Sequence, residues 1–165
     1  MKMREIDSGD IIFVKGKTVV SQFIKFFDKG KFSHVCIAIT PHLVLEAQYG
    51  TKVRITPFRF KIEDCEIVKL PLNDRQKRLI TNHATLFTGK KYDYLQLLSY
   101  IFKGVDIDKQ NCYICSELVS LILSMVGYEE CEFEKDLSPN QLYNHLMEHL
   151  KGVNHNEKKN RFNTN

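Results

Sequence analysis

Three residues of this chain have types and surroundings that could support nucleophilic catalysis: a cysteine, a histidine and a glutamate. Cys115 lies in the segment NCYICSELVSLILSMVG, residues 111–127, whose apolar residues recur at helical spacing up to Gly127. The free N–H groups and the dipole at a helix start stabilise a thiolate there, and the thiolate is the nucleophile. Cys115 is therefore a candidate catalytic residue, although a cysteine on an apolar stripe is equally typical of a protein core.

His34 and Glu46 lie in a predicted β-hairpin, with strands over 33–39 and 43–49 and a turn at Thr40-Pro41-His42. Alternation places His34, Cys36 and Ala38 on one face with Val44 and Glu46, while the other face is apolar. If the numbers of paired residues sum to an even value near 80, His34 lies opposite Glu46 or diagonal to it, with Cβ atoms about 5 Å apart when opposite. An odd sum would put the two side chains on opposite faces.

A carboxylate bonded to one imidazole nitrogen fixes the tautomer and leaves the other nitrogen to activate a nucleophile. Packing the start of the cysteine helix against the His34 face would complete a Cys115–His34–Glu46 triad. Both residues of the hairpin also have an ordinary structural interpretation. A histidine in a strand is often a hydrogen-bonded structural residue, and Glu46 could occupy an exposed strand position.

Other cysteines and histidines suggest weaker alternatives. Cys112 and Cys115 form a C-x-x-C, which could be a redox pair or half of a zinc site, but the chain has no second C-x-x-C. His145 and His149 have a spacing that can bind zinc, yet Leu146 stands where H-E-x-x-H requires glutamate, so a partly exposed helix face is favoured. We therefore expect no metal.

The elements around these residues change from strands to helices along the chain. Further strands are predicted over 11–14, 52–56 and 66–70, and helices over 18–30, 73–89, 93–102 and 138–152. Asn73 and Gln76 have the spacing of a capping box at the start of the 73–89 helix. This order favours an α+β domain in which an antiparallel sheet packs against helices.

Composition places the chain among ordinary globular proteins. Its 165 residues are 43% hydrophobic and 27% charged, with a net charge of +4 spread along the sequence, which does not suggest nucleic-acid binding. We expect one domain over 1–153 and a polar, disordered tail over 154–165. The absence of a signal-peptide pattern or membrane span predicts a cytoplasmic protein, in which the five cysteines are reduced. The oligomeric state is left open.

Four segments resemble the circularly permuted NlpC/P60 hydrolases, a papain-like cysteine hydrolase family whose wider group includes lecithin retinol acyltransferase-like proteins. These are GDIIFVKG, FSHVCIAI with His34, LVLEA with Glu46, and YICSELVS with Cys115. In ordinary members the cysteine precedes the histidine, whereas here the order is His, Glu, Cys, as in the permuted branch. The resemblance implies a papain-like fold with Cys115 as nucleophile and His34 as base. It supports Glu46 less firmly, because some relatives have histidine in the third position.

The resemblance implies acyl transfer through a thioester, without a cofactor. We expect a thiol peptidase or amidase acting on a peptide or acyl-amide substrate, with cell-wall-derived peptides as one option. An acyltransferase or lipid-acyl hydrolase on the same triad, or a non-catalytic domain that binds a peptide or lipid, stays open. Tyr113, two residues before Cys115, could contribute to a pocket or the oxyanion site, and Tyr92 or Tyr94 could line the cleft.

Overall fold

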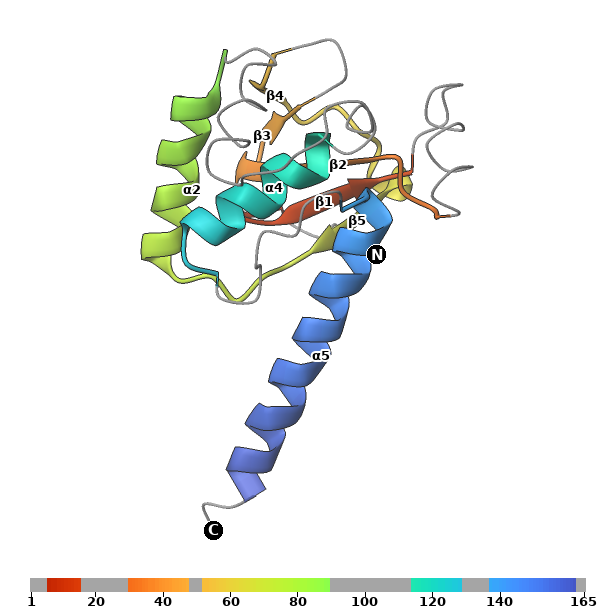
Figure 1. Cartoon of the computed structure of the whole chain (residues 1–165), viewed down its shortest axis with the longest axis vertical. Helices are drawn as coiled ribbons and strands as arrows, with labels where there is room; N and C mark the ends of the chain where they lie inside the picture. The colour runs from red at the N-terminus through yellow and green to blue at the C-terminus, as the bar shows by residue number, and fades with distance from the viewer. Residues whose placement is uncertain (1–5, 16–29, 48–51, 90–113, 129–136, 163–165) are drawn as a thin grey trace, which may run out of the picture.

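The computed structural model describes residues 6–15, 30–47, 52–89, 114–128 and 137–162, with side chains described in these ranges except for Ile114 and residues 153–162. It contains a five-stranded antiparallel sheet in the order β4-β3-β2-β1-β5. The strands are β1 (Ile11–Val14), β2 (His34–Thr40), β3 (Leu43–Glu46), β4 (Arg54–Pro57) and β5 (Cys65–Val68), with the short 3₁₀ helix η1 (Ile62–Asp64) before β5. Figure 1 shows helices packed beside this sheet, which confirms the predicted α+β class.

The described helices are α2 (Asp74–Phe87), α4 (Ile114–Met125) and α5 (Pro139–Phe162). Helix α2 begins with the predicted capping box, in which the Asn73 side chain accepts from the Gln76 backbone and Gln76 reciprocates. The predicted helices over 18–30 and 93–102 lie largely or wholly outside the described residues.

The β2–β3 register agrees with the even-sum prediction. Ile37 pairs with Leu45 and Ala38 with Val44, so both sums are 82 (37 + 45 and 38 + 44). The register shifts between Ala38 and Thr40, next to the turn where the Thr40 hydroxyl accepts the backbone N–H groups of His42 and Leu43. Because the shift lies beyond Ala38, it does not disturb the pairing closer to Glu46.

The sheet separates two clusters of buried residues. One face contributes Val35, Ile37 and Leu45 to the main core, where they meet the apolar residues of α2, α4 and α5. The opposite face contributes Cys36, Ala38 and Val44 to a smaller cluster that includes Ile12 and Val14. The alternation predicted from the sequence is therefore confirmed for these two strands.

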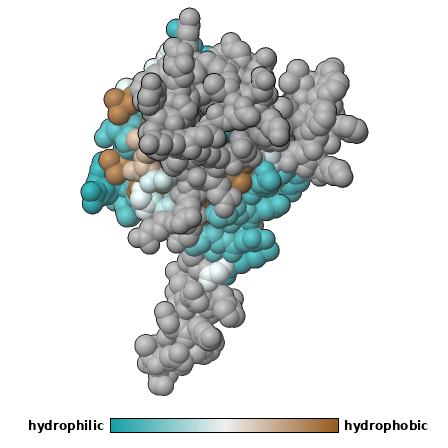
Figure 2. All heavy atoms as spheres, in the orientation of Figure 1, coloured by the Kyte–Doolittle hydropathy of each residue, from teal (hydrophilic) through white to brown (hydrophobic). Residues whose placement is uncertain are grey.

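Helix α5 extends further than predicted. We expected it to end at Gly152 with a disordered segment after it, but the helix continues to Phe162. Glycine inside a helix costs only about 1 kcal/mol relative to alanine, so Gly152 can be accommodated. The second half of α5 projects away from the sheet in Figure 1, and the coloured part of α5 in Figure 2 is hydrophilic on the side seen.

Candidate active site

His34 and Glu46 form a direct contact across the β2–β3 hairpin. The Nε2 atom of His34 lies 3.2 Å from Oε2 of Glu46. His34 is the first residue of β2 and Glu46 the last of β3, and the even register places them diagonally on one face. The structure therefore brings together the two residues that the hairpin pattern paired.

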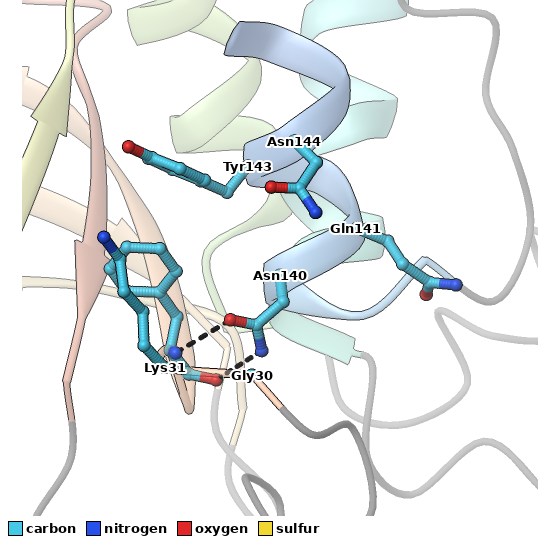
Figure 3. A pocket seen from close by; sticks show the side chains of 7 residues that line it. Gly30, Lys31, Asn140, Gln141, Tyr143 and Asn144 are labelled. Carbon is cyan, nitrogen blue, oxygen red and sulfur yellow. Dashed lines mark hydrogen bonds between the residues drawn. The ribbon is translucent and has the colours of Figure 1, made fainter. Parts of the chain in front are cut away.

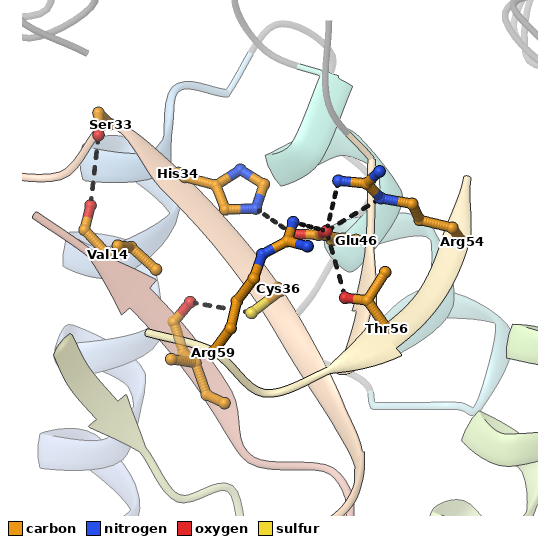
Figure 4. A network of polar contacts seen from close by, with 9 residues as sticks. Val14, Ser33, His34, Cys36, Glu46, Arg54, Thr56 and Arg59 are labelled. Atoms are coloured by element: carbon orange, nitrogen blue, oxygen red, sulfur yellow. Dashed lines mark hydrogen bonds and ion pairs between the residues drawn. The ribbon is translucent and has the colours of Figure 1, made fainter. Parts of the chain in front are cut away.

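The Glu46 carboxylate is buried and bonded through both oxygens (Figure 4). Its Oε1 atom accepts from Arg54 Nε at 3.1 Å, Thr56 Oγ1 at 3.2 Å and Arg59 Nη2 at 2.7 Å. Burial alone would raise the pKa of Glu46, but the hydrogen bond and charge of His34, together with Arg59 and Arg54, lower the pKa to about 2. Glu46 is therefore ionised throughout the neutral range.

Cys115 is the second residue of α4 as described, and its side chain is buried in the main core. Cys115 lies near enough to His34 that its interaction with the imidazole raises the pKa of His34. Since Nε2 of His34 lies against Glu46, Nδ1 is the ring nitrogen left for Cys115. Burial alone would lower the pKa of His34, but the bonds to Cys115 and Glu46 outweigh it and raise the pKa to about 9.

One part of the predicted packing was wrong. We expected the start of the cysteine helix to pack against the His34 face of the hairpin, whereas α4 joins the core cluster of Val35 and Ile37 on the opposite face. The physical reason is that the apolar stripe of α4 must be buried against an apolar surface. His34 and Cys115 meet because each stands at the start of its element.

The other described cysteines are poor nucleophiles. Burial raises the pKa of Cys36 well above its usual value, and the nearby Glu46 charge raises it further. Burial and Asp64 raise the pKa of Cys65 to about 11. Neither thiol lies in a setting that stabilises a thiolate. Cys112, and with it the C-x-x-C alternative, lies outside the described residues, as does Cys131.

Three predicted pocket residues, Tyr92, Tyr94 and Tyr113, also lie outside the described residues. The predicted partly exposed helix face agrees with the structure, in which His145 and His149 are half-buried on α5. The centroids of the His149 and Tyr128 rings lie 5.8 Å apart. Within the part of the chain that the structure describes, no group of three histidine, cysteine, aspartate or glutamate residues is arranged to hold a metal ion.

The sequence reasoning missed the cationic partners of Glu46. Arg54 pairs with Glu46 in the β3–β4 register, and Thr56 lies two residues further along the same strand. Strand alternation could have placed both beside Glu46. Arg59 follows the end of β4, so no strand periodicity relates it to Glu46. The ring of the next residue, Phe60, lies near His34, with the two ring centroids 5.9 Å apart.

A separate cavity of about 390 Å³ lies beside the start of α5 (Figure 3). Asn140 there binds both the backbone N–H and the carbonyl of Phe32, at 2.9 Å each. This pairing ties α5 to the segment that leads into β2. None of Cys115, His34 and Glu46 lines the cavity, so it is distinct from their cluster.

A buried thiol, an imidazole and an ionised carboxylate that lie near one another are residue types that nucleophilic acyl transfer can use. Among the described residues, no helix combines the length and apolar character needed to cross a membrane. A search of curated proteins finds no match. A family model described as "Permuted papain-like amidase enzyme, YaeF/YiiX, C92 family" matches residues 5–157, and the chain therefore belongs to this family of papain-like amidase enzymes.

Proposed function

We propose that this enzyme hydrolyses amide bonds of small peptides, with Cys115 as nucleophile, His34 as general acid and base, and Glu46 as the group that orients His34. The observation that carries the proposal is the 3.2 Å contact of His34 with the buried carboxylate of Glu46, together with the position of Cys115 near His34 at the start of α4. The amidase description of the family supports amide substrates.

The resting enzyme holds an ion pair in this mechanism. With its pKa raised to about 9, His34 is protonated at neutral pH and can act as the counter-ion of the attacking thiolate. The thiolate attacks the amide carbonyl carbon, and the Cys115 backbone N–H at the start of α4 donates to the developing oxyanion. Glu46 stabilises the imidazolium and keeps Nδ1 directed at the reacting atoms.

Collapse of the tetrahedral intermediate breaks the C–N bond, and His34 gives its proton to the leaving amine, which leaves a thioester on Cys115. His34, now neutral, takes a proton from water, and the resulting hydroxide attacks the thioester carbonyl. The C–S bond then breaks, releasing the carboxylic acid and restoring the thiolate–imidazolium pair. No cofactor takes part in this cycle.

Product analysis by mass spectrometry tests the substrate class. The enzyme is incubated with muropeptides, with acyl-lipids, and with acyl-lipids plus an added amine, and Cys115→Ala is the control. We expect two fragments per cleaved amide, whose masses sum to the mass of the substrate plus one water, and no fragments with Cys115→Ala. Transfer of an acyl chain from lipid to amine, without cleavage of any peptide, would instead assign the same three residues to an acyltransferase.

A further inference from the structure

The two oxygens of the Glu46 carboxylate have different partners. Oε2 lies against His34, whereas Oε1 accepts hydrogen bonds from Arg54, Thr56 and Arg59. Figure 4 shows these donors approaching from β4 and the segment after it. The face of the carboxylate turned away from His34 is therefore enclosed by donors, two of them cationic.

Arg59 differs from an ordinary surface ion-pair partner. Its side chain is 50% exposed, but the Glu46 side chain that it binds at 2.7 Å is 0% exposed. A buried carboxylate has lost the water that would stabilise its charge, so a guanidinium at this distance has a larger effect than in an exposed pair. Within the described residues Arg59 donates a hydrogen bond to Glu46, which makes this carboxylate the group that connects Arg59 to His34.

We propose that Arg59 is a positioning residue of the enzyme, which keeps Glu46 ionised and leaves its Oε2 atom to His34. This inference rests on the proposed function, since it assumes that Cys115 reacts as a thiolate paired with the His34 imidazolium. Without the Arg59 guanidinium, the carboxyl group takes up a proton at higher pH. A neutral carboxyl no longer stabilises the imidazolium, and Cys115 then reacts more slowly in mild acid.

The rate of Cys115 alkylation by iodoacetamide measures this effect without any amide substrate. The rate is followed from about pH 3.5 to pH 8 by peptide mass spectrometry, for the wild type, Arg59→Met, Arg59→Lys and the control Arg78→Met on the exposed side of α2. Because an opposite charge within about 4–6 Å lowers a carboxyl pKa by roughly 1–3 units, we expect Arg59→Met to react about fivefold more slowly than wild type near pH 4. Arg59→Lys should stay close to wild type, as should Arg78→Met.

A double-mutant cycle then tests whether Arg59 acts through Glu46. In the Glu46→Gln background, Arg59→Met should cause no further loss, because its target is already neutral. The inference would be overturned if Arg59→Met lowered the alkylation rate equally in the wild-type and Glu46→Gln backgrounds. A wild-type alkylation rate for Arg59→Met near pH 4 would overturn it as well. Circular dichroism checks the fold, and Arg59→Gln replaces Arg59→Met if the latter does not fold. Failure of the wild-type Cys115 to react preferentially would count against the proposed function itself.

Discussion

At the scale of single residues, the site depends on two groups whose pKa values move in opposite directions. Hydrogen bonding outweighs burial in both, raising the pKa of His34 to about 9 and lowering that of Glu46 to about 2. Both groups are consequently charged over the whole neutral range. In the proposed mechanism the His34 imidazolium is the counter-charge of the attacking thiolate, and Glu46 stabilises the imidazolium.

Replacing members of the proposed triad should have unequal effects on turnover. Cys115→Ser removes the nucleophilic thiolate and should reduce kcat/KM by at least about 10³-fold, whereas Glu46→Gln leaves nucleophile and base in place and should retain measurable activity. Steady-state kinetics on a peptide cleaved in the product analysis would measure both. Wild-type turnover by Glu46→Gln would make Glu46 a structural residue and reduce the triad to a dyad.

The pairing of His34 with Glu46 could be predicted from the sequence because a strand has a period of two residues and a short turn allows few registers. The position of Arg59 could not, because it follows the last residue of β4 at Pro57 and no periodic pattern relates it to Glu46. Similarly, the contact between Cys115 and His34 depends on tertiary packing between residues far apart in the sequence. The family resemblance suggested that contact, but periodicity did not.

At the scale of elements, α4 positions Cys115 by burying its apolar stripe against β2. Leu118, Val119 and Ile122 are fully buried in the cluster that contains Val35 and Ile37. The sequence indicated this stripe correctly but could not show which face of the hairpin it covers, because the small cluster on the His34 face also contains apolar residues. The larger buried cluster lies on the Val35 face and also includes residues of α2 and α5, which accounts for the choice observed.

Replacing one buried and one exposed side chain of α4 by alanine should change the free energy of unfolding by different amounts. Ile122 is 0% exposed, so Ile122→Ala should lower the free energy of unfolding by about 2–5 kcal/mol. Met125 is 45% exposed, so Met125→Ala should change it by less than about 1 kcal/mol. Urea unfolding followed by circular dichroism would compare the two. Equal losses would mean that the assigned face of α4 is incorrect.

At the scale of the whole molecule, the His34–Glu46 pair links folding stability to pH. Taking ordinary values for the unfolded chain, the Glu46 contribution is complete above about pH 4.5 and is lost as the pH falls towards about 2. The His34 contribution is complete below about pH 6.5 and is lost as the pH rises through about 9. Part of each shift comes from the His34–Glu46 contact, so that part is counted once, and the stabilisation is greatest between these limits.

Glu46→Gln should therefore destabilise the protein most in weakly acidic solution. Near pH 6 we expect a loss on the order of 2–3 kcal/mol relative to wild type, shrinking as the wild-type carboxylate becomes protonated below about pH 4. Thermal or urea unfolding of both proteins across this range would measure the difference. A difference that stays constant down to about pH 2.5 would show that the ionised carboxylate is not the source of the stability.

The broad organisation of the molecule followed from the sequence, since strands preceding helices led to the observed antiparallel sheet with helices beside it. The extent of α5 did not, because the polar residues after Gly152 lack the apolar stripe by which a packed helix is recognised. The single-domain boundary at residue 153 and the cytoplasmic location stay predictions.

The measurement that tests the central claim most directly is identification of the acylated residue during turnover. The enzyme is quenched in acid while it cleaves a peptide amide, and the trapped thioester is located by intact-mass and peptide-level mass spectrometry. We predict one acyl group on Cys115 in the wild type and none in Cys115→Ala, which should also form no product. An acyl group on another cysteine, or undiminished cleavage by Cys115→Ala, would contradict the assignment of Cys115 as the nucleophile.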